Sequence, residues 1–454
     1  MLLATIVLSW PAIINGSALT FPDTASYYKG GALAVAKIRT ILASVAGSGD
    51  GAAGAAAIDQ TLEGVRGVRS AFYSLFVYVT SPGRSFGTVA IQGAVIAWLS
   101  LLLIRAAFPA LHARAFLLVI VLVAAGTGAP WVTSYLMPDV FAAVVILATA
   151  LLALYHRSLS RAELVALVLL LSFAITAHPT HLLLGGGLLV VAPLAARVAH
   201  GVWRETPAIL TWLGLPLVLA VAGLLFVGIV GFKSVSVVPA SEPFMLARAI
   251  DDGPAYRYIK ERCPRERFVV CAFADRLPTR SAHVFLWEPD GVMSRASPAE
   301  RAQIAAQEMD VVWAAIRAYP LEQLYASSRN VVRQLTAFGL GQFWWGRLDL
   351  SNPEDPSVPR YVEEERGFFA AFTAIHYAVV IASLLVILGL SFARTARLAR
   401  EHLALVAVIG LGILGNAAIC AVLSGPAERY QIRVVWLVPL LAAAIGIARL
   451  MRSR

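Results

Sequence analysis

Charged residues and cysteines are scarce in this chain of 454 residues. Asp, Glu, Lys and Arg make up only 14% of it, against roughly a quarter in soluble domains, whereas 59% of the residues are hydrophobic. This composition excludes a soluble enzyme, a disordered chain and a typical nucleic-acid-binding protein. Three cysteines are too few for a disulfide scaffold, so packing in a lipid bilayer must hold the fold together.

Acidic residues are the scarcer of the two charged types. The chain carries 37 basic and 27 acidic side chains, which gives a formal net charge of +10. A basic chain can bind nucleic acid, but here many basic residues stand at the ends of long apolar runs. Their positions indicate a role in membrane topology, and we expect no nucleic-acid partner.

Long apolar runs are abundant. A helix needs about 20 mostly apolar residues to cross a bilayer. Ten runs approach this length, so the sequence predicts an all-α polytopic membrane protein with about ten transmembrane helices. The predicted spans are 2–19, 86–107, 115–133, 139–155, 162–177, 182–197, 209–232, 369–392, 403–424 and 434–449.

Arginines alternate between the connections of these spans. Twelve of them occupy one set of short connections and the C-terminal end, namely Arg105, Arg114, Arg157, Arg161, Arg197, Arg204, Arg394, Arg397, Arg400, Arg449, Arg452 and Arg454. The opposite short connections carry only Arg429 and Arg433. Because basic loops stay in the cytoplasm, we expect both termini there, as an even number of spans requires.

The first apolar run, 2–19, has an alternative interpretation as a cleaved signal peptide. We favour a retained helix, because the run lacks a basic region beyond the amino terminus and contains Pro11. Either interpretation leaves residues 20–85 outside the cytoplasm.

Two long segments are predicted on the outer face. The segment 20–85 contains a patch rich in Gly and Ala, Ala43 to Ala57, which is typical of a flexible loop tip. The segment 233–368 is long enough for a small domain. A possible strand at Arg267–Phe273 and helical patterns near 300–318 and 320–338 predict a mixed α/β fold for it. The chain thus divides into a membrane module 1–232, an outer segment 233–368 and a membrane module 369–454.

Two of the cysteines, Cys263 and Cys271, stand eight residues apart in the second outer segment. In an oxidising compartment this spacing favours a local disulfide over two free thiols. Metal binding is not favoured there, because no further His or Cys stands at ligand spacing. Cys420 lies within a predicted span and is interpreted as a small apolar residue.

Two acids stand at the outer membrane boundary. Asp23 follows the first span and Asp139 begins the fourth. Carboxylates from separate loops at one depth can converge on one cavity, where they act as a general base or hold a divalent metal. The structural alternative is that each acid caps or electrostatically stabilises the start of a helix.

Basic and aromatic side chains occur at the same boundary. Arg429 and Arg433, beside Tyr430, are suited to bind a lipid phosphate, or they anchor the headgroup region. His178 and His181 could bind substrate or relay a proton, or satisfy loop backbone groups. Further candidates are Tyr27, Lys29, Arg66, Arg69 and Tyr73 in the first outer loop, and Trp344, Trp345 and Arg347 in the second outer segment, where rings could stack on a sugar or rest on the bilayer.

The pattern of acids and spans resembles the GT-C superfamily of membrane glycosyltransferases, which includes protein mannosyltransferases and the lipid A aminoarabinose transferase. The resemblance rests on Asp23 within Pro-Asp-Thr-Ala-Ser-Tyr, Asp139 within Met-Pro-Asp, and Arg429-Tyr430 ahead of a span that contains Pro439. It implies a bacterial inner-membrane enzyme with a periplasmic active site and a polyprenyl-phosphate sugar as donor.

The same resemblance implies roles for these residues. Asp23 would be the catalytic acid or base or a metal ligand, with Asp139 as the second acid, and Arg429 would clamp the leaving lipid phosphate, with Arg433 and Lys29 as further candidates. Many relatives carry two adjacent acids after the first span, whereas Asp23 is followed by Thr24. A divalent metal, Mg or Mn, held by Asp23 and Asp139 is therefore an open prediction.

The sequence leaves four functional hypotheses, the last of which is a non-catalytic assembly protein whose outer domain binds partners. The first is a glycosyltransferase that moves a sugar from a polyprenyl-phosphate donor to a lipid, glycan or protein acceptor. The second is a polysaccharide polymerase or ligase that uses a lipid-diphosphate glycan. The third is a lipid or glycan transporter, but transporters place polar groups at mid-membrane and often show repeated halves, and neither feature is evident here.

Overall fold

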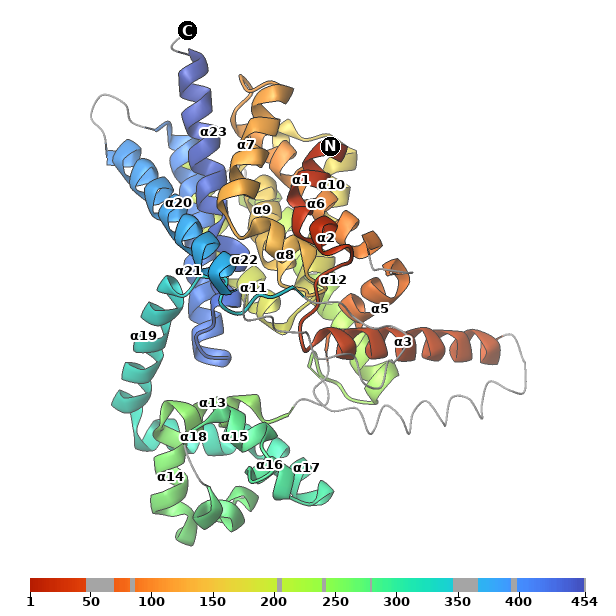
Figure 1. Ribbon diagram of the computed structural model, residues 1–454. Coiled ribbons are helices and arrows are strands. Elements are labelled where there is room, and N and C mark those ends of the chain that lie inside the picture. The colour runs from red at the N-terminus through yellow and green to blue at the C-terminus, as the bar shows by residue number, and fades with distance from the viewer. Residues whose placement is uncertain are drawn as a thin grey trace.

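The computed structural model describes residues 1–45, 69–81, 86–201, 206–238, 242–277, 280–345, 366–392 and 398–452. Within these ranges the chain is mostly α-helical and forms no strand, apart from one isolated parallel bridge between Leu19 and Tyr135. Figure 1 shows a bundle of long helices with a smaller group of short helices beyond one end. The predicted all-α membrane architecture is therefore confirmed at this level.

Six helical segments of the described chain are long and apolar enough to cross a membrane. They are α6 (Phe86–Ala107), α11 (Pro179–His200), α12 (Thr206–Phe232), α20 (Arg366–Phe392), α21 (Arg400–Leu423) and the pair α22 (Glu428–Val435) and α23 (Leu437–Arg452), which together form one span. On α12 and α20 the side chains of Val218, Phe226 and Leu385 are exposed, as expected for helices that contact lipid.

The other four predicted spans coincide with shorter helices. The first run is broken at Ser9 into α1 (Leu2–Leu8) and α2 (Trp10–Asn15), because Pro11 starts a new helix. The third run is likewise divided into α7 (Ala113–Gly126) and α8 (Ala129–Ser134). The last two are α9 (Val140–Leu154) and α10 (Arg161–Thr176), with 15 and 16 residues.

Helix α9 is the centre of the bundle. All of its residues are buried, as expected for a helix that is apolar on every side. Helices α6, α10, α11 and α21 pack around it. Its first residue follows Asp139, so the helix that fixes the core also fixes the position of this acid.

The first outer segment contains helices that the sequence interpretation had taken as loop. α3 (Thr24–Val45) extends sideways from one end of the bundle, nearly perpendicular to the long helices, and α5 (Ala71–Thr80) packs against it (Figure 1). The two approach closely at Gly31, where a Cβ atom would lie 2.3 Å from the carbonyl oxygen of Ser74. Most of the Gly- and Ala-rich patch lies outside the described residues.

The second outer segment is a group of short helices. It comprises α13 (Phe244–Asp252), α14 (Pro254–Arg262), η3 (Cys263–Arg265), η4 (Val269–Arg276), α15 (Ala282–Trp287), α16 (Val292–Arg295), α17 (Pro298–Ala306), α18 (Glu308–Ala318) and α19 (Pro320–Thr336). The first eight of these elements, α13 to α18, enclose a buried apolar cluster separate from that of the bundle. α19 then leads back to the bundle (Figure 1).

The strand predicted at Arg267–Phe273 is wrong. Residues Val269–Arg276 form the 3-10 helix η4, and Cys271 is joined to Cys263 by a disulfide with Cα atoms 5.0 Å apart. The backbone N–H of Val269 donates to the Gln307 side chain at 2.9 Å. A β-prone run forms a strand only beside a partner strand, and the described residues of this segment provide none.

A polar network attaches the outer helices to α19. Arg248 of α13 pairs with Asp251 and Asp252, and Asn330 of α19 donates to Asp252 at 2.7 Å. Arg248 also lies against Gly425, which has a φ of +91°, at the end of α21. The outer helices therefore contact the loop that precedes α22.

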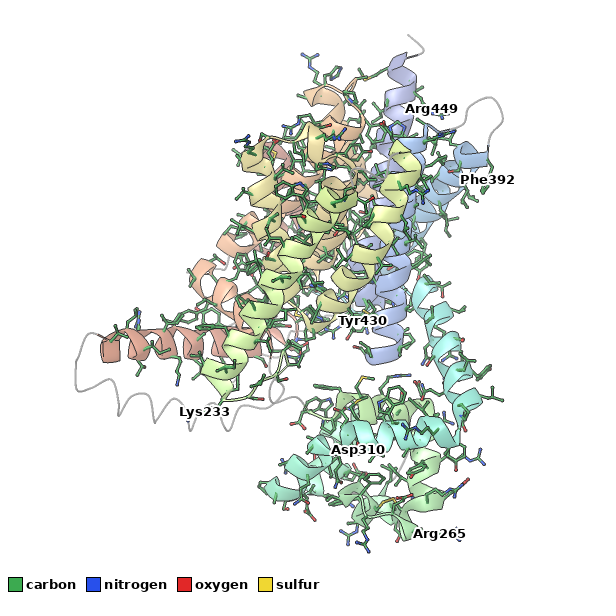
Figure 2. The ribbon with its side chains drawn as sticks, turned by 180° about the vertical axis from the view of Figure 1, so that it is seen from behind. Lys233, Arg265, Asp310, Phe392, Tyr430 and Arg449 are labelled. Carbon is green, nitrogen blue, oxygen red and sulfur yellow. A yellow bond between two sulfur atoms is a disulfide. The ribbon has the colours of Figure 1, made fainter. Side chains whose placement is uncertain are left out.

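The two ends of the bundle differ in their residues. Figure 2 places Arg449 and Phe392 at one end and Tyr430 and Lys233 at the other. The chain termini lie at the first end, and α3 and the outer helices lie at the second (Figure 1). At the first end Arg105 pairs with Glu163, whose carboxylate also caps α10 through Ser160.

Candidate functional site

Asp23 lies at the start of α3, and its side chain is held by two arginines. The carboxylate pairs with Arg69, which precedes α5, and with Arg429 of α22, whose Nη1 is 3.5 Å from Oδ2. The backbone carbonyl of Asp23 accepts the first helical hydrogen bonds of α3, from Ser26 and Tyr27. The residue thus starts the helix with its backbone, while its carboxylate is directed to the guanidinium groups.

Asp139 precedes α9 and pairs with Arg433 of α22, whose Nη1 donates to Oδ1 at 3.0 Å. The Asp139 side chain forms no capping bond with the described part of α9. Arg433 is 1% exposed and donates in addition to Asn416 and to the sulfur of Cys420. One buried cation therefore ties three helices together at this acid.

A short backbone contact brings the two acids to the same place. Leu19 N donates to the carbonyl of Ser134 at 2.9 Å, and Leu136 N donates to the carbonyl of Leu19 at 3.0 Å. The hydroxyl of Thr24 donates to the carbonyl of Leu136 at 3.3 Å. The segment that leads into Asp23 is thereby fixed beside the segment that leads into Asp139.

The first turns of α22 supply the arginines that meet both acids. Arg429 and Arg433 lie one helical turn apart, with their guanidinium carbons 4.8 Å and 5.4 Å from the ring centre of Tyr430. Arg429 also lies 4.6 Å from the ring centre of Phe21. The two arginines share one face of the helix, because α22 begins at Glu428 and includes both of them.

The outer segment holds the loop that leads into Arg429 and α22. The side-chain amide of Gln334, in α19, donates to the carbonyl of Ala427 at 2.8 Å and accepts from its N–H at 2.9 Å. The side chain of Gln342 accepts from the backbone N–H of Arg429 at 3.1 Å. The position of α19 is therefore coupled to the start of α22.

Two histidines lie beside this cluster. His178 caps α11 and its Nδ1 is 2.8 Å from the hydroxyl of Thr180, while Nδ1 of His181 is 2.8 Å from the carbonyl of Ala174. Both rings thus satisfy local groups, as the structural alternative predicted. Nε2 of His181 is buried and has no hydrogen-bond partner among the described residues.

The remaining sequence-derived candidates lie in different environments. Tyr27 is buried against Tyr73 with ring centres 5.0 Å apart, and Arg69 lies 5.9 Å from the Tyr27 ring centre. Lys29 is exposed on α3 and lines a groove on the far side of Arg69. Arg66 and Arg347 lie outside the described residues.

The two tryptophans of the outer segment pack within the protein. Trp344 stacks on Phe21 with ring centres 5.1 Å apart, and its backbone N–H donates to the hydroxyl of Tyr135 at 2.8 Å. Trp345 lies 4.9 Å from Trp131 in an aromatic cluster of the bundle. These rings help to fix the segment between α19 and α20 against the site.

Small cavities adjoin the paired acids. One, of about 20 Å³, is lined by Asp139, Arg429 and Phe21 among others, and another, of about 40 Å³, is lined by Arg69 and His178. Spaces of this size hold water rather than a sugar ring.

The described residues do not fit a divalent metal at Asp23 and Asp139. Their carboxylates are paired with three guanidinium groups, which leave one positive charge in excess and would repel a cation. The described chain also has no cluster of three or more His, Cys, Asp or Glu residues that could hold a metal.

Several polar residues of the site escaped the sequence interpretation. Asn416 and Gln92 lie within apolar spans, and Gln92 donates to the carbonyl of Tyr135 at 3.0 Å and accepts from the hydroxyl of Tyr73 at 3.0 Å. An amide within an apolar run is a signal for an internal partner and could have identified both residues. Gln334 and Gln342 gave no such signal.

Comparisons of the chain with protein-family models, with curated proteins and with solved structures find no match.

Proposed function

We propose that the protein is a GT-C-type glycosyltransferase that moves a sugar from a polyprenyl-phosphate donor to an acceptor. The observation that carries the proposal is the convergence of Asp23 and Asp139 with three arginines at one end of a membrane bundle. Two carboxylates supply a base, and the excess guanidinium charge suits a phosphate leaving group.

The proposed reaction is a single displacement at the anomeric carbon. The acceptor oxygen bonds to this carbon while the bond from the carbon to the donor phosphate oxygen breaks. The electron pair leaves with the polyprenyl phosphate, and Asp23 takes the proton of the acceptor hydroxyl. Because Arg433 uses its donors within the protein, we assign it the role of positioning Asp139, and assign phosphate binding to the more exposed arginines.

The proposed topology keeps all ten predicted spans. The shorter helices α9 and α10, and the broken pairs α1–α2 and α7–α8, would complete the count alongside the six long segments. Both termini would then face the cytoplasm and the paired acids the periplasm of a bacterial inner membrane. The N-terminus lies at the opposite end of the bundle from α3, which Asp23 immediately precedes, and this supports the orientation (Figure 1).

Turnover by the purified protein tests the proposal. Supplied with a polyprenyl-phosphate sugar and candidate lipid, glycan or protein acceptors, the wild type should release polyprenyl phosphate. Asp23→Asn should lose at least about 100-fold in rate while it stays folded. Asp290→Asn, an exposed acid of the outer helices, is the matched control and should turn over normally. Full turnover by Asp23→Asn would sink the assignment.

A second candidate is a polysaccharide polymerase or ligase that uses a lipid-diphosphate glycan. Two observations favour it. Nε2 of His181 is buried and has no hydrogen-bond partner among the described residues, and the neighbouring Thr180 accepts a hydrogen bond from Arg433. Loss of transfer in His181→Ala together with normal transfer in Asp23→Asn would select this alternative.

A further inference from the structure

A groove adjoins Arg69, the partner of Asp23, between α3, α5 and the end of α12. Its volume is about 410 Å³, which is within the range of small-molecule sites. Its apolar walls include Leu33 and Ile38 of α3, Phe72 and Leu75 of α5, and Phe226 and Val230 of α12. Nothing in the proposed reaction so far uses this space.

Basic side chains line the same groove. Lys29 and Lys37 lie two turns apart on α3, and Arg69 stands where the groove meets Asp23. Apolar walls with a basic edge match a ligand that has a long hydrocarbon part and an anionic head. Beyond the groove, Leu42 and Val45 of α3 expose 63% and 81% of their surface, so an apolar chain can continue along this helix.

Arg69 belongs both to the groove and to the site. It lines the 410 Å³ groove and the adjoining 40 Å³ cavity, and its Nη2 pairs with Asp23. Its Nε is buried and has no hydrogen-bond partner among the described residues. The guanidinium therefore has a donor available to a ligand in addition to the one that holds the acid.

From this arrangement we infer that the groove holds the hydrocarbon chain of the polyprenyl phosphate and that Lys29 and Arg69 bind its phosphate, with Arg69 leaving Asp23 as it does so. The inference rests on the proposed function for the identity of the lipid. It assigns the phosphate to Lys29 and Arg69 on the groove side of Asp23, whereas the sequence had favoured Arg429.

The exchange has a consequence for the base. In the structure the carboxylate of Asp23 is paired with Arg69 and Arg429, so both of its oxygens are directed to guanidinium groups. A lipid phosphate that draws Arg69 away leaves Asp23 with Arg429 alone, at 3.5 Å. By drawing Arg69 away, the donor frees the Asp23 carboxylate and opens the space that the Arg69 side chain occupied. The site therefore becomes competent only when the donor is bound.

Direct binding of a polyprenyl monophosphate that carries no sugar tests the inference independently of transfer. With the full-length protein in detergent, Lys29→Ala and Arg69→Ala should each weaken binding about tenfold or more. Arg161→Ala, the same change at the start of α10, should bind as the wild type. Ala34→Phe, which fills the groove, should weaken binding, whereas Ala36→Phe, on another face of α3, should not.

The exchange of Arg69 has its own readout. Asp23→Asn should bind the lipid phosphate several-fold more tightly, because Arg69 no longer has to leave a carboxylate. This gain should disappear in the Arg69→Ala background, a coupling that a merely structural role would not produce. Additive effects of the two substitutions would overturn the exchange.

Three results would overturn the site itself. Binding that survives Lys29→Ala, Arg69→Ala and Ala34→Phe would remove the lipid from the groove. Binding that instead depends on Arg429 would place the phosphate at α22. Equal displacement by dioleoyl phosphatidic acid would show that the occupant is a bilayer phospholipid. If binding behaves as expected but no sugar is ever transferred, the proposed reaction fails and the lipid site stands.

Discussion

Arg433 donates to Asp139 across 3.0 Å with its side chain only 1% exposed, and its other donors go to Asn416, Thr180 and Cys420. All three nitrogens of the guanidinium are thus used inside the protein. A cation in this state fixes an acid in place, whereas Arg429, with 22% of its side chain exposed, has a nitrogen beside Asp23, Nη1, that makes no hydrogen bond with the described residues. Two arginines one turn apart on α22 therefore have different tasks.

This difference predicts unequal losses in the free energy of unfolding when Arg433 and Arg429 are each replaced by Met. Arg433→Met leaves Asp139, whose side chain is 13% exposed, without a counterion, which should lower the free energy of unfolding by about 3–5 kcal/mol. Arg429→Met makes the same chemical change on the same helix and should lower it by about 1 kcal/mol or less, because Asp23 keeps Arg69 as its counterion. Thermal unfolding in detergent measures both. Equal destabilisation would contradict the assignment of tasks.

Gln334 is predicted to act through Arg429. Its amide forms two hydrogen bonds with the backbone of Ala427, so Gln334→Ala should release the loop before α22 and lower the turnover number about tenfold with little change in KM. Hydrogen exchange at residues 425–429 should become faster. Gln303→Ala, an exposed glutamine of α17, is the control. An unchanged turnover number with uniformly faster exchange would mean that the residue only stabilises the fold.

Transfer is predicted to be independent of divalent metal. Asp23 and Asp139 are each paired with a guanidinium, so a cation would have to displace an arginine to bind either carboxylate. Turnover should therefore be unchanged after treatment with EDTA and after addition of Mg²⁺ or Mn²⁺. The control is a metal-dependent glycosyltransferase treated in the same buffer. A loss of activity that Mg²⁺ restores would show that the arginines yield to a metal.

The apolar runs and the boundary acids could be predicted because each is a local property of the sequence. Spans need length and hydropathy, and an acid at the end of a span is visible without any partner. The convergence of Asp23 and Asp139 was only a hypothesis at that stage. Its physical cause is the backbone contact of Leu19 with Ser134 and Leu136, which joins residues more than a hundred positions apart.

Other features depend on tertiary contacts that leave no local pattern. Cys420 has the composition of a core residue, yet its sulfur receives a hydrogen bond from Arg433 at 3.1 Å. The β-prone run at Val269 became a 3-10 helix, because the disulfide to Cys263 and the bond to Gln307 fix it where no strand is available among the described residues. Propensity was overruled by packing in this case.

The outer helices are predicted to lose stability as the pH rises. Glu308 starts α18, and its carboxylate accepts from the backbone N–H groups of Met245 and Leu246, at 2.5 Å and 3.1 Å. Burial nevertheless raises the pKa of this carboxyl above its ordinary value. An acid with a raised pKa keeps its proton longer in the folded state than in the unfolded state. Its contribution is therefore complete below the unfolded pKa of about 4.3 and is lost as the pH rises through the folded value.

Hydrogen exchange of α13 and α18 in the full chain should accelerate over this window, and Glu308→Gln, which keeps an acceptor and cannot ionise, should remove the acceleration. Glu300→Gln, at an exposed helix start where the capping bonds from Ser297 lower the pKa, should leave it in place. The same pH dependence in Glu308→Gln would assign the titration to another group.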